Sequence, residues 1–309
     1  MVSKFCGPPP HFYLFHRHEF FDKQLQSFRK HDIMKFTYAH FAHTGEKGER
    51  PMGKSIAIVN QKGGVGKTTS CVNLAAALTA QEARVLVCDF DPQGNATSGF
   101  GVDKAHSPSV YDAILGGAPI SKTIVSTKWA DVAPANKALS GATVELISLD
   151  RREFRLRDAL DEVKERYDFI FIDCPPSLEL LTLDALCAAD TLLVPVQCEY
   201  YALEGLSDLL YTVRLAKQRL NPDLELEGVL LTMYDGRTNL SLQVAEEVKR
   251  HFPGKVYASV VPRNVRLSEA PSHGVPVTVY DPLSRGAEAY QALAAEFLAK
   301  NPDAVKSRK

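Results

Sequence analysis

The chain has 309 residues, of which 45% are hydrophobic and 24% charged, and its formal net charge at pH 7 is −1. This composition is ordinary for a soluble α/β protein, and the near-zero charge means that any binding of nucleic acid must come from a local patch. The six cysteines form no C-x-x-C pair and no apolar run reaches transmembrane length. We therefore expect reduced thiols in a cytoplasmic protein rather than a disulfide framework or a membrane protein.

The first fifty residues differ from the rest, because they hold six of the nine histidines and eight of the fifteen phenylalanines. They contain neither the apolar core nor the cleavage site of a signal peptide. Met52 stands directly before the first strand-like segment, so we interpret residues 1–51 as an upstream extension outside the fold. The expected domain then covers 52–301, and 302–309 form a tail.

From Ser55 onward, short apolar runs alternate with helix-length amphipathic segments. The predicted strands are 55–60, 84–90, 167–176, 191–197, 226–234 and 255–262. The predicted helices are 68–80, 151–167, 178–189, 203–220, 239–252 and 284–300. Residues 101–145 are expected to add short helices and one more strand. Continuously apolar strands are typical of a parallel sheet covered on both faces, and their alternation with helices predicts a doubly wound α/β domain with a mostly parallel sheet.

The first strand runs into the glycine-rich stretch KGGVGKTT (62–69), and a helix follows. This context predicts a phosphate-binding loop in which Lys67 reaches the β- and γ-phosphates and the Thr68 hydroxyl holds Mg²⁺. The backbone N–H groups that would surround the phosphates belong to Gly63, Gly64, Val65 and Gly66. The loop departs from the usual pattern, since Gln61 stands where a glycine is expected and a second lysine, Lys62, lies at its mouth.

Acidic residues stand at the ends of two further predicted strands. Asp173 ends the strand within 167–176, where a carboxylate can hold magnesium through its water shell. Asp89 and Asp91 follow the strand 84–90; Asp91, close to a proline and a glycine, is expected on a loop where it can orient a water, whereas Asp89 could equally be a structural cap. Parallel strands present their carboxyl ends at one edge, so these residues should converge on the glycine loop.

Several longer motifs resemble one family. KGGVGKTT is similar to the deviant Walker A motif of the MinD/ParA group of P-loop ATPases. The stretches that resemble its chromosomal, Soj-like ParA branch are DFDPQGNATSGFG (89–101), PVQCEYYALEGL (195–206), LLTMYDGRTNLSLQV (230–244) and VPRNVRLSEAPSHG (261–274). The resemblance covers residue 52 to about residue 300.

The resemblance implies a slow, Mg²⁺-dependent ATPase that forms a homodimer around two ATP molecules. Lys62 would reach the phosphates bound by the second protomer, although a solvated surface lysine is the alternative from the residues alone. Asp91 would position the attacking water. The implied magnesium set is Thr68, Asp91 and Asp173. The other implied ATP contacts are Thr69, which follows Thr68, and, around the adenine, Pro262, Arg263 and Asn264.

The resemblance further implies that Arg237 and Arg266 contact DNA without reading its sequence. Lys249, Arg250 and Arg263 would extend that surface. From the residues alone, an intramolecular ion pair is the more common fate of a single arginine. Dimerisation would double the patch, and binding should weaken steeply with salt. The implied partner is a DNA-bound ParB-like protein that stimulates hydrolysis, and the expected location is the cytoplasm, in association with the nucleoid.

Three rival interpretations are less favoured. A MinD-like ATPase that binds membrane would need a basic amphipathic C-terminal helix, and Pro302 interrupts that segment. An iron–sulfur reductase would need paired exposed cysteines, and a related tyrosine kinase a terminal tyrosine cluster. A non-enzymatic interpretation, a nucleotide-gated DNA-binding scaffold with negligible ATP turnover, is closer to the favoured one than any of these three. The alternative that we keep is a deviant Walker A ATPase that positions a protein or membrane-associated cargo instead of DNA.

Overall fold

A computed structural model describes residues 53–200 and 202–305. In this part of the chain the strands form one seven-stranded sheet in the order β3-β4-β2-β5-β1-β6-β7. Every neighbouring pair is parallel except β3 and β4, which are antiparallel. The predicted fold class, a doubly wound α/β domain with a mostly parallel sheet, is therefore confirmed. The predicted extension 1–51 lies outside the described residues.

The strands are β1 Lys54–Ile58, β2 Val85–Asp89, β3 Val125–Ser126, β4 Asp131–Ala133, β5 Phe169–Asp173, β6 Thr191–Gln197 and β7 Glu225–Thr232. The α-helices are α2 Lys67–Thr79, α3 Asn95–Gly99, α4 Val110–Leu115, α5 Ile120–Thr123, α6 Leu139–Leu146, α7 Arg155–Asp161, α8 Leu180–Ala188, α9 Ala202–Arg219, α10 Asn239–His251, α11 Val265–Glu269, α12 Val277–Tyr280 and α13 Arg285–Lys300. Three single turns of 3-10 helix are η1 Arg152–Phe154, η2 Lys164–Arg166 and η3 Ala270–His273.

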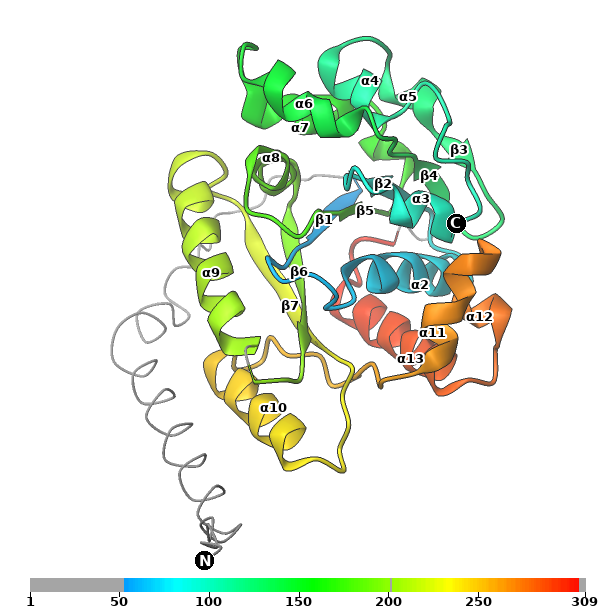
Figure 1. Cartoon of the computed structure of the whole chain (residues 1–309), viewed down its shortest axis with the longest axis vertical. Helices are drawn as coiled ribbons and strands as arrows, with labels where there is room; N and C mark the ends of the chain where they lie inside the picture. Colours follow the sequence, from blue (N-terminus) through cyan, green and yellow to red (C-terminus); the bar gives the residue numbers. More distant parts are fainter. Residues whose placement is uncertain (1–52, 201, 306–309) are drawn as a thin grey trace, which may run out of the picture. The chain divides into compact units, whose positions relative to one another are not determined.

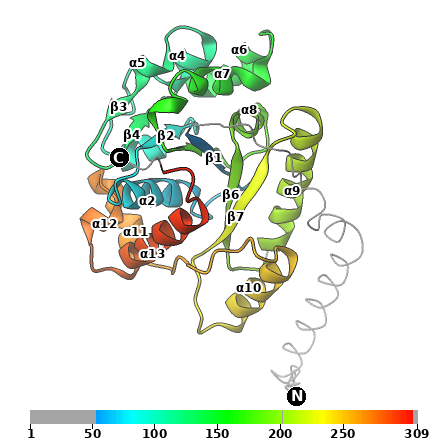
Figure 2. The same ribbon diagram turned by 180° about the vertical axis from the view of Figure 1, so that it is seen from behind.

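Helices cover both faces of the sheet, as the continuously apolar strands require. In Figure 1 the sheet lies between α2 and α13 on one side and α8 and α9 on the other, and Figure 2 shows the same layers from behind. Every residue of β2 and β5 is buried. Phe169 and Phe171 of β5 pack against Phe297 of α13, with ring centroids 5.1 and 5.7 Å apart. The last described residues, Ala304 and Val305, also pack against this core.

The prediction of a strand over 255–262 is wrong. This segment forms isolated bridges, from Val256 to Val229 of β7 and from Pro262 to Tyr234 just beyond β7, and the Val261 N–H donates to the Leu231 carbonyl of β7 at 2.9 Å. Between the two bridges the backbone N–H groups of Ala258 and Ser259 donate to the Glu296 carboxylate of α13, at 2.9 and 2.8 Å. Their hydrogen bonds therefore go to a helix instead of a neighbouring strand, and a continuous ladder cannot form.

Two other predicted segments are more broken than expected. The helix predicted over 151–167 is divided into η1, α7 and η2, and α7 holds only the middle of it. Residues 101–145 form the short helices α4, α5 and α6 as expected, but two short strands, β3 and β4, in place of one. Periodicity predicts a helical stretch well, but it does not show where the backbone changes from one helix type to another.

Candidate nucleotide site

The glycine loop joins β1 to α2, as predicted. Gly64 and Gly66 have φ angles of 74° and 89°, a left-handed conformation that side chains with a Cβ rarely adopt. Gly66 precedes α2, and no side chain among the described residues caps the first turn of this 13-residue helix. The Thr232 hydroxyl at the end of β7 donates to the Val65 carbonyl at 2.8 Å and so holds the loop in place. The result is an open helix N-terminus whose N–H groups suit an anion.

The side chain of Lys67 lies inside this loop. Its side chain is buried, with 6% of the residue exposed, and its Nζ donates to the Lys62 carbonyl at 3.1 Å. Burial lowers the pKa of the Lys67 ammonium, and the Asp173 and Asp91 carboxylates oppose that shift. The hydrogen bond to one carbonyl replaces only part of the hydration that the Lys67 ammonium loses on burial. An anionic ligand would therefore stabilise the charged form strongly.

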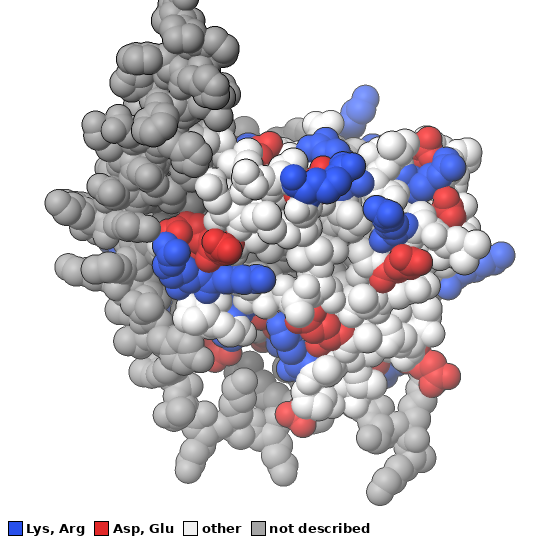
Figure 3. Space-filling view, turned by 90° about the horizontal axis from the view of Figure 1, so that it is seen from below, with Lys and Arg blue, Asp and Glu red and all other residues white. Residues whose placement is uncertain are grey.

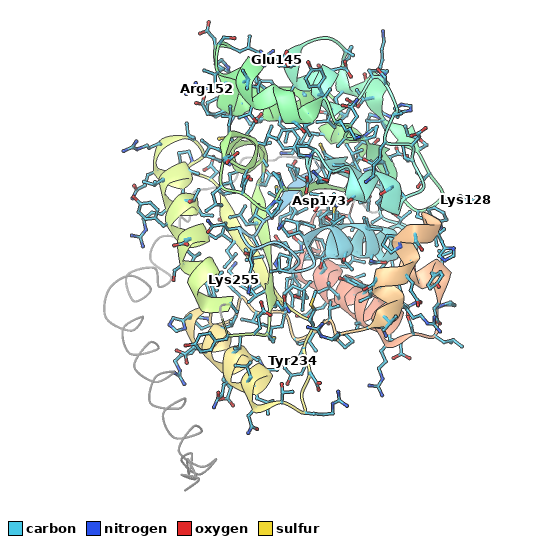
Figure 4. All side chains as sticks on the ribbon, viewed as in Figure 1. Lys128, Glu145, Arg152, Asp173, Tyr234 and Lys255 are labelled. Atoms are coloured by element: carbon cyan, nitrogen blue, oxygen red, sulfur yellow. The ribbon has the colours of Figure 1, made fainter. Side chains whose placement is uncertain are left out.

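Asp173 is the most unusual group at this edge of the sheet. It ends β5, opposite Ile58 of β1 and Asp89 of β2 in the strand register. Figure 4 shows it in the interior of the molecule, beside α2. The residue is fully buried, and neither carboxylate oxygen accepts a hydrogen bond of normal geometry from the described residues. Burial raises the pKa of Asp173 well above its usual value, and the nearby Thr68 hydroxyl partly opposes this.

These residues fit a magnesium site. An orphaned buried carboxylate next to a hydroxyl presents oxygen atoms, which Mg²⁺ prefers, and the ion usually adds phosphate and water ligands to one or two from the protein. The described residues contain no group of three or more His, Cys, Asp and Glu side chains that could hold a metal alone. Further ligands for a magnesium ion here would be phosphate oxygens or water.

The two candidate aspartates after β2 have different surroundings in the structure. Asp89 is fully buried and accepts hydrogen bonds from the Thr97 backbone N–H (2.6 Å), the Thr97 hydroxyl (2.7 Å) and the Asp91 N–H (3.3 Å). It is therefore the structural cap of α3, with its pKa raised by burial to about 6. Asp91 has one oxygen bonded to the Gln93 N–H at 2.9 Å. Its charge acts on both Lys67 and Asp173, so it lies near these two residues.

Lys62 lies at the rim of the loop and is only partly exposed. Its ammonium forms an ion pair with the Glu199 carboxylate, in the turn between β6 and α9. Its backbone N–H donates to the Asn60 side chain at 3.0 Å. The two lysines of the loop thus have different surroundings: Lys67 faces the interior, while Lys62 pairs with a carboxylate on the surface.

The segment predicted to hold the adenine lies beside the end of β7. Pro262 forms a parallel bridge with Tyr234, two residues after the Thr232 that holds the glycine loop. Tyr234, labelled in Figure 4, lies between β7 and α10. The Asn264 side chain caps α11 by accepting from the Arg266 N–H at 2.9 Å, and Arg263 is exposed. Within the loop helix, the Thr69 carbonyl accepts from the Asn73 side chain at 2.8 Å.

The arginines predicted to contact DNA are exposed, and both have acidic partners. The Arg237 side chain, 90% exposed, pairs with Asp235 at 2.8 Å. Arg266 pairs with Glu269 at 2.8 Å and with Asp281 at 3.0 Å. Figure 3, seen from the side of α10, shows basic and acidic side chains interspersed. The intramolecular ion pairs that sequence reasoning weighed as an alternative are thus present, and no single-sign surface stands out in this view.

The same interspersion holds on α10. Lys249 is exposed, and Arg250 pairs with Glu247 at 2.7 Å. Sequence reasoning missed the residues that position the site, namely Asn60, Thr97, Glu199 and Thr232. Asn60, Glu199 and Thr232 are polar side chains at or just beyond strand ends, so the rule that ligands gather at that edge of the sheet could have found them. Thr97 lies inside α3 and had no such signal. Along the described chain, no helix has both the length and the apolar character needed to cross a bilayer.

Known proteins share this fold and loop. A family model described as an AAA domain matches residues 53–226, more than half of the chain. The sporulation initiation inhibitor protein Soj of Bacillus subtilis is 60% identical over 251 residues, 80% of this chain and 99% of that protein. The chromosome partitioning protein ParA of Myxococcus xanthus is 54% identical over 260 residues, 83% and 92% of the two chains.

The fold is also similar to that of a solved structure, cobyrinic acid a,c-diamide synthase from Mycobacterium smegmatis with bound ADP and magnesium. The TM-score is 0.72 with 38% identity, over 82% of this chain and 98% of that one. The sequence identity to Soj and ParA is higher and extends over nearly their whole length. With the deviant glycine loop, the orphaned Asp173 and the parallel sheet in place, this chain belongs to the Soj/ParA family of P-loop proteins.

Proposed function

We propose that this protein is a partition ATPase that binds Mg²⁺-ATP, closes into a homodimer around two nucleotides and then binds DNA without reading its sequence. The observation that carries the proposal is the glycine loop with two lysines in opposite surroundings, one buried and one at the rim. The relatives named Soj and ParA, and a related structure with ADP and magnesium, support this assignment.

The residues of the loop would divide the work on the nucleotide. The N–H groups of the loop and of the first turn of α2 would bind the phosphates, and Lys67 would contact their outer oxygens. Thr68 and Asp173 would hold magnesium, with Asp91 close by. The ion, when bound, neutralises charge that develops on the phosphate oxygens. Asp91, held at the loop by the Gln93 N–H, would orient the attacking water.

Lys62 would act on the second protomer. Lys67 already occupies the inside of its own loop and would contact the phosphates bound there. The Lys62 ammonium, at the rim, could instead contact the phosphates bound by a second protomer that faces it. A positive charge supplied in trans stabilises the charge on a transferring phosphoryl group. Hydrolysis would remove the γ-phosphate that Lys62 contacts, and the dimer would separate. A ParB-like partner bound to DNA would accelerate this step in the cytoplasm, at the nucleoid.

The DNA surface would include Arg237 and Arg266. Exposed ion pairs contribute only about 0–1 kcal/mol, so the pairs with Asp235 and with Glu269 and Asp281 can open when phosphates approach. In a single protomer both arginines are engaged by carboxylates, so doubling the patch in a dimer would favour their transfer to phosphates. This explains why binding would depend on ATP in a chain whose net charge is −1.

The test uses Asp91→Ala, which should bind ATP and accumulate as a dimer because hydrolysis is lost. Light scattering after size exclusion would compare ATP with ADP, and binding to non-specific DNA would follow over a salt series. We expect a dimer with ATP only, and DNA binding by the dimer only, with an affinity that falls steeply as salt rises.

Arg237→Ala in the same background should still dimerise but bind DNA more weakly and with a shallower salt slope. A dimer that ignores DNA would move the assignment to an ATPase that positions a protein or membrane-associated cargo. Absence of any ATP-dependent dimer, or rapid phosphate release by Asp91→Ala, would overturn the proposed mechanism itself.

A further inference from the structure

The backbone of Lys62 is held through the Asn60 side chain. Its N–H donates to the Asn60 side chain at 3.0 Å, and the Asn60 amide donates to the Pro195 carbonyl of β6 at 2.7 Å. The first turn of α9 faces the loop at Gly205, where an added Cβ would stand 4.0 Å from the Lys62 Cβ, so there is room beside the lysine side chain. Because the main chain is held, the side chain is the part of Lys62 that can change position.

That side chain is bound to a carboxylate of its own protomer. The ammonium of Lys62 pairs with Glu199, and the two side chains are 32% and 37% exposed. The turn that carries Glu199 is itself held, because its carbonyl accepts from the Ala202 N–H at 3.0 Å and its N–H donates to the Gln197 carbonyl at 2.8 Å. Glu199 is therefore a fixed acceptor beside a movable cation, at the rim of the nucleotide loop.

We propose that Glu199 is a positioning residue that holds Lys62 in cis and thereby opposes formation of the ATP-bound dimer. The inference rests on the proposed function, in which Lys62 contacts the phosphates of the partner protomer. To do so, its ammonium has to leave the Glu199 carboxylate, because an anion beside the phosphate oxygens would be repelled by them. Lys62 would thus exchange the Glu199 carboxylate of its own protomer for a phosphate bound by the partner. This exchange would couple nucleotide binding to dimer formation.

The size of the effect follows from the exposure of the pair. An ion pair between partly exposed side chains changes an equilibrium by about two- to fivefold, and a dimer has to open two of them. Removal of the Glu199 charge should therefore lower the protein concentration at the midpoint of dimerisation by roughly 4- to 25-fold. The pair is screened by salt, so the advantage should shrink as ionic strength rises.

The experiment compares Glu199→Gln with wild type in magnesium and a non-hydrolysable ATP analogue, by sedimentation over a concentration series at low and high salt. The matched control is Asp223→Asn, an equal loss of charge at an exposed position before β7, at the other end of that strand from the loop. We expect the lower midpoint in Glu199→Gln only, with unchanged analogue affinity of the monomer. An unchanged or higher midpoint would overturn the inference.

Lys62→Ala separates this result from the proposed function. If Lys62→Ala dimerises like wild type, the trans role of the lysine is wrong, whatever Glu199 does. If Lys62→Ala stays monomeric while Glu199→Gln matches wild type, only the inference about Glu199 fails. The double variant should stay monomeric like Lys62→Ala. Dimers of the double variant would show that Glu199 acts through another group, which also refutes the inference.

Discussion

Asp173→Asn should make the nucleotide-free protein more stable while it removes the response to magnesium. The carboxylate of Asp173 is fully buried, with no hydrogen bond to either oxygen from the described residues. Thr68 and Lys67 lie nearby and offset part of the cost, but burial and the charges of Asp89 and Asp91 disfavour this carboxylate. A buried acceptor without a hydrogen bond of normal geometry costs about 1–3 kcal/mol or more, and a neutral amide of the same shape costs less. In a domain of this size each kcal/mol shifts Tm by roughly 2–4 °C. The variant should therefore melt about 2–12 °C higher.

The assay is thermal unfolding of wild type and variant without nucleotide, with ADP and EDTA, and with ADP and magnesium. ADP is used because the proposed dimer forms only with ATP, and a dimer would make Tm depend on protein concentration. Wild type should gain stability from magnesium at constant ADP, by about 2.7 kcal/mol when the free ligand is 100 times its Kd. Asp173→Asn should gain little, because its amide is a poor ligand for the ion.

Asp89→Asn is the matched control for this prediction. Asp89 lies opposite Asp173 in the strand register and is equally buried, but it accepts three hydrogen bonds. The same change there removes charge-assisted bonds and should lower the free energy of unfolding by about 1–3 kcal/mol. The reasoning would be refuted if Asp173→Asn melted at or below wild type, or if magnesium stabilised it as it does wild type.

Three further changes test other parts of the structure. Lys67→Ala should weaken ATP binding by at least about 100-fold in calorimetry, since two charge-assisted bonds of about 1.5–3 kcal/mol each are lost; wild-type affinity would contradict the site. Gly63→Val should bind ATP normally, because a Cβ at this position meets only Pro176 among the described residues, at 4.0 Å. It should nevertheless stay monomeric, because the added side chain at the loop rim would obstruct the second protomer; an ATP-dependent dimer would refute this. Burial raises the pKa of Asp184 to about 8, so its contribution to stability is complete below about pH 4 and is lost as pH rises through 8. Asp184→Asn should therefore flatten the fall of Tm between about pH 4 and 8, and an unchanged slope over that range would exclude this carboxyl as the cause.

The sequence predicted the fold and the frame of the site because both depend on local patterns. The strand within 55–60, the glycine loop and the helix after it follow one another directly, and their residues carry the required conformations themselves. Asp173 was found in the same way, as an acidic residue at the end of an apolar strand. Apolar runs without alternation were sufficient to predict a parallel sheet covered on both faces, since only buried strands lack a polar side.

Only the tertiary structure decided what each charged residue contacts. The sequence left open whether Asp89 is a structural cap, and its contacts with Thr97 decide that it is. The partner of Lys62 is Glu199, 137 residues away, and the ladder expected over 255–262 is interrupted because Glu296 takes its N–H groups. Such contacts depend on which distant segments the packing brings together. Local propensity contains no information about them, so composition and spacing can name a candidate residue but cannot name its partner.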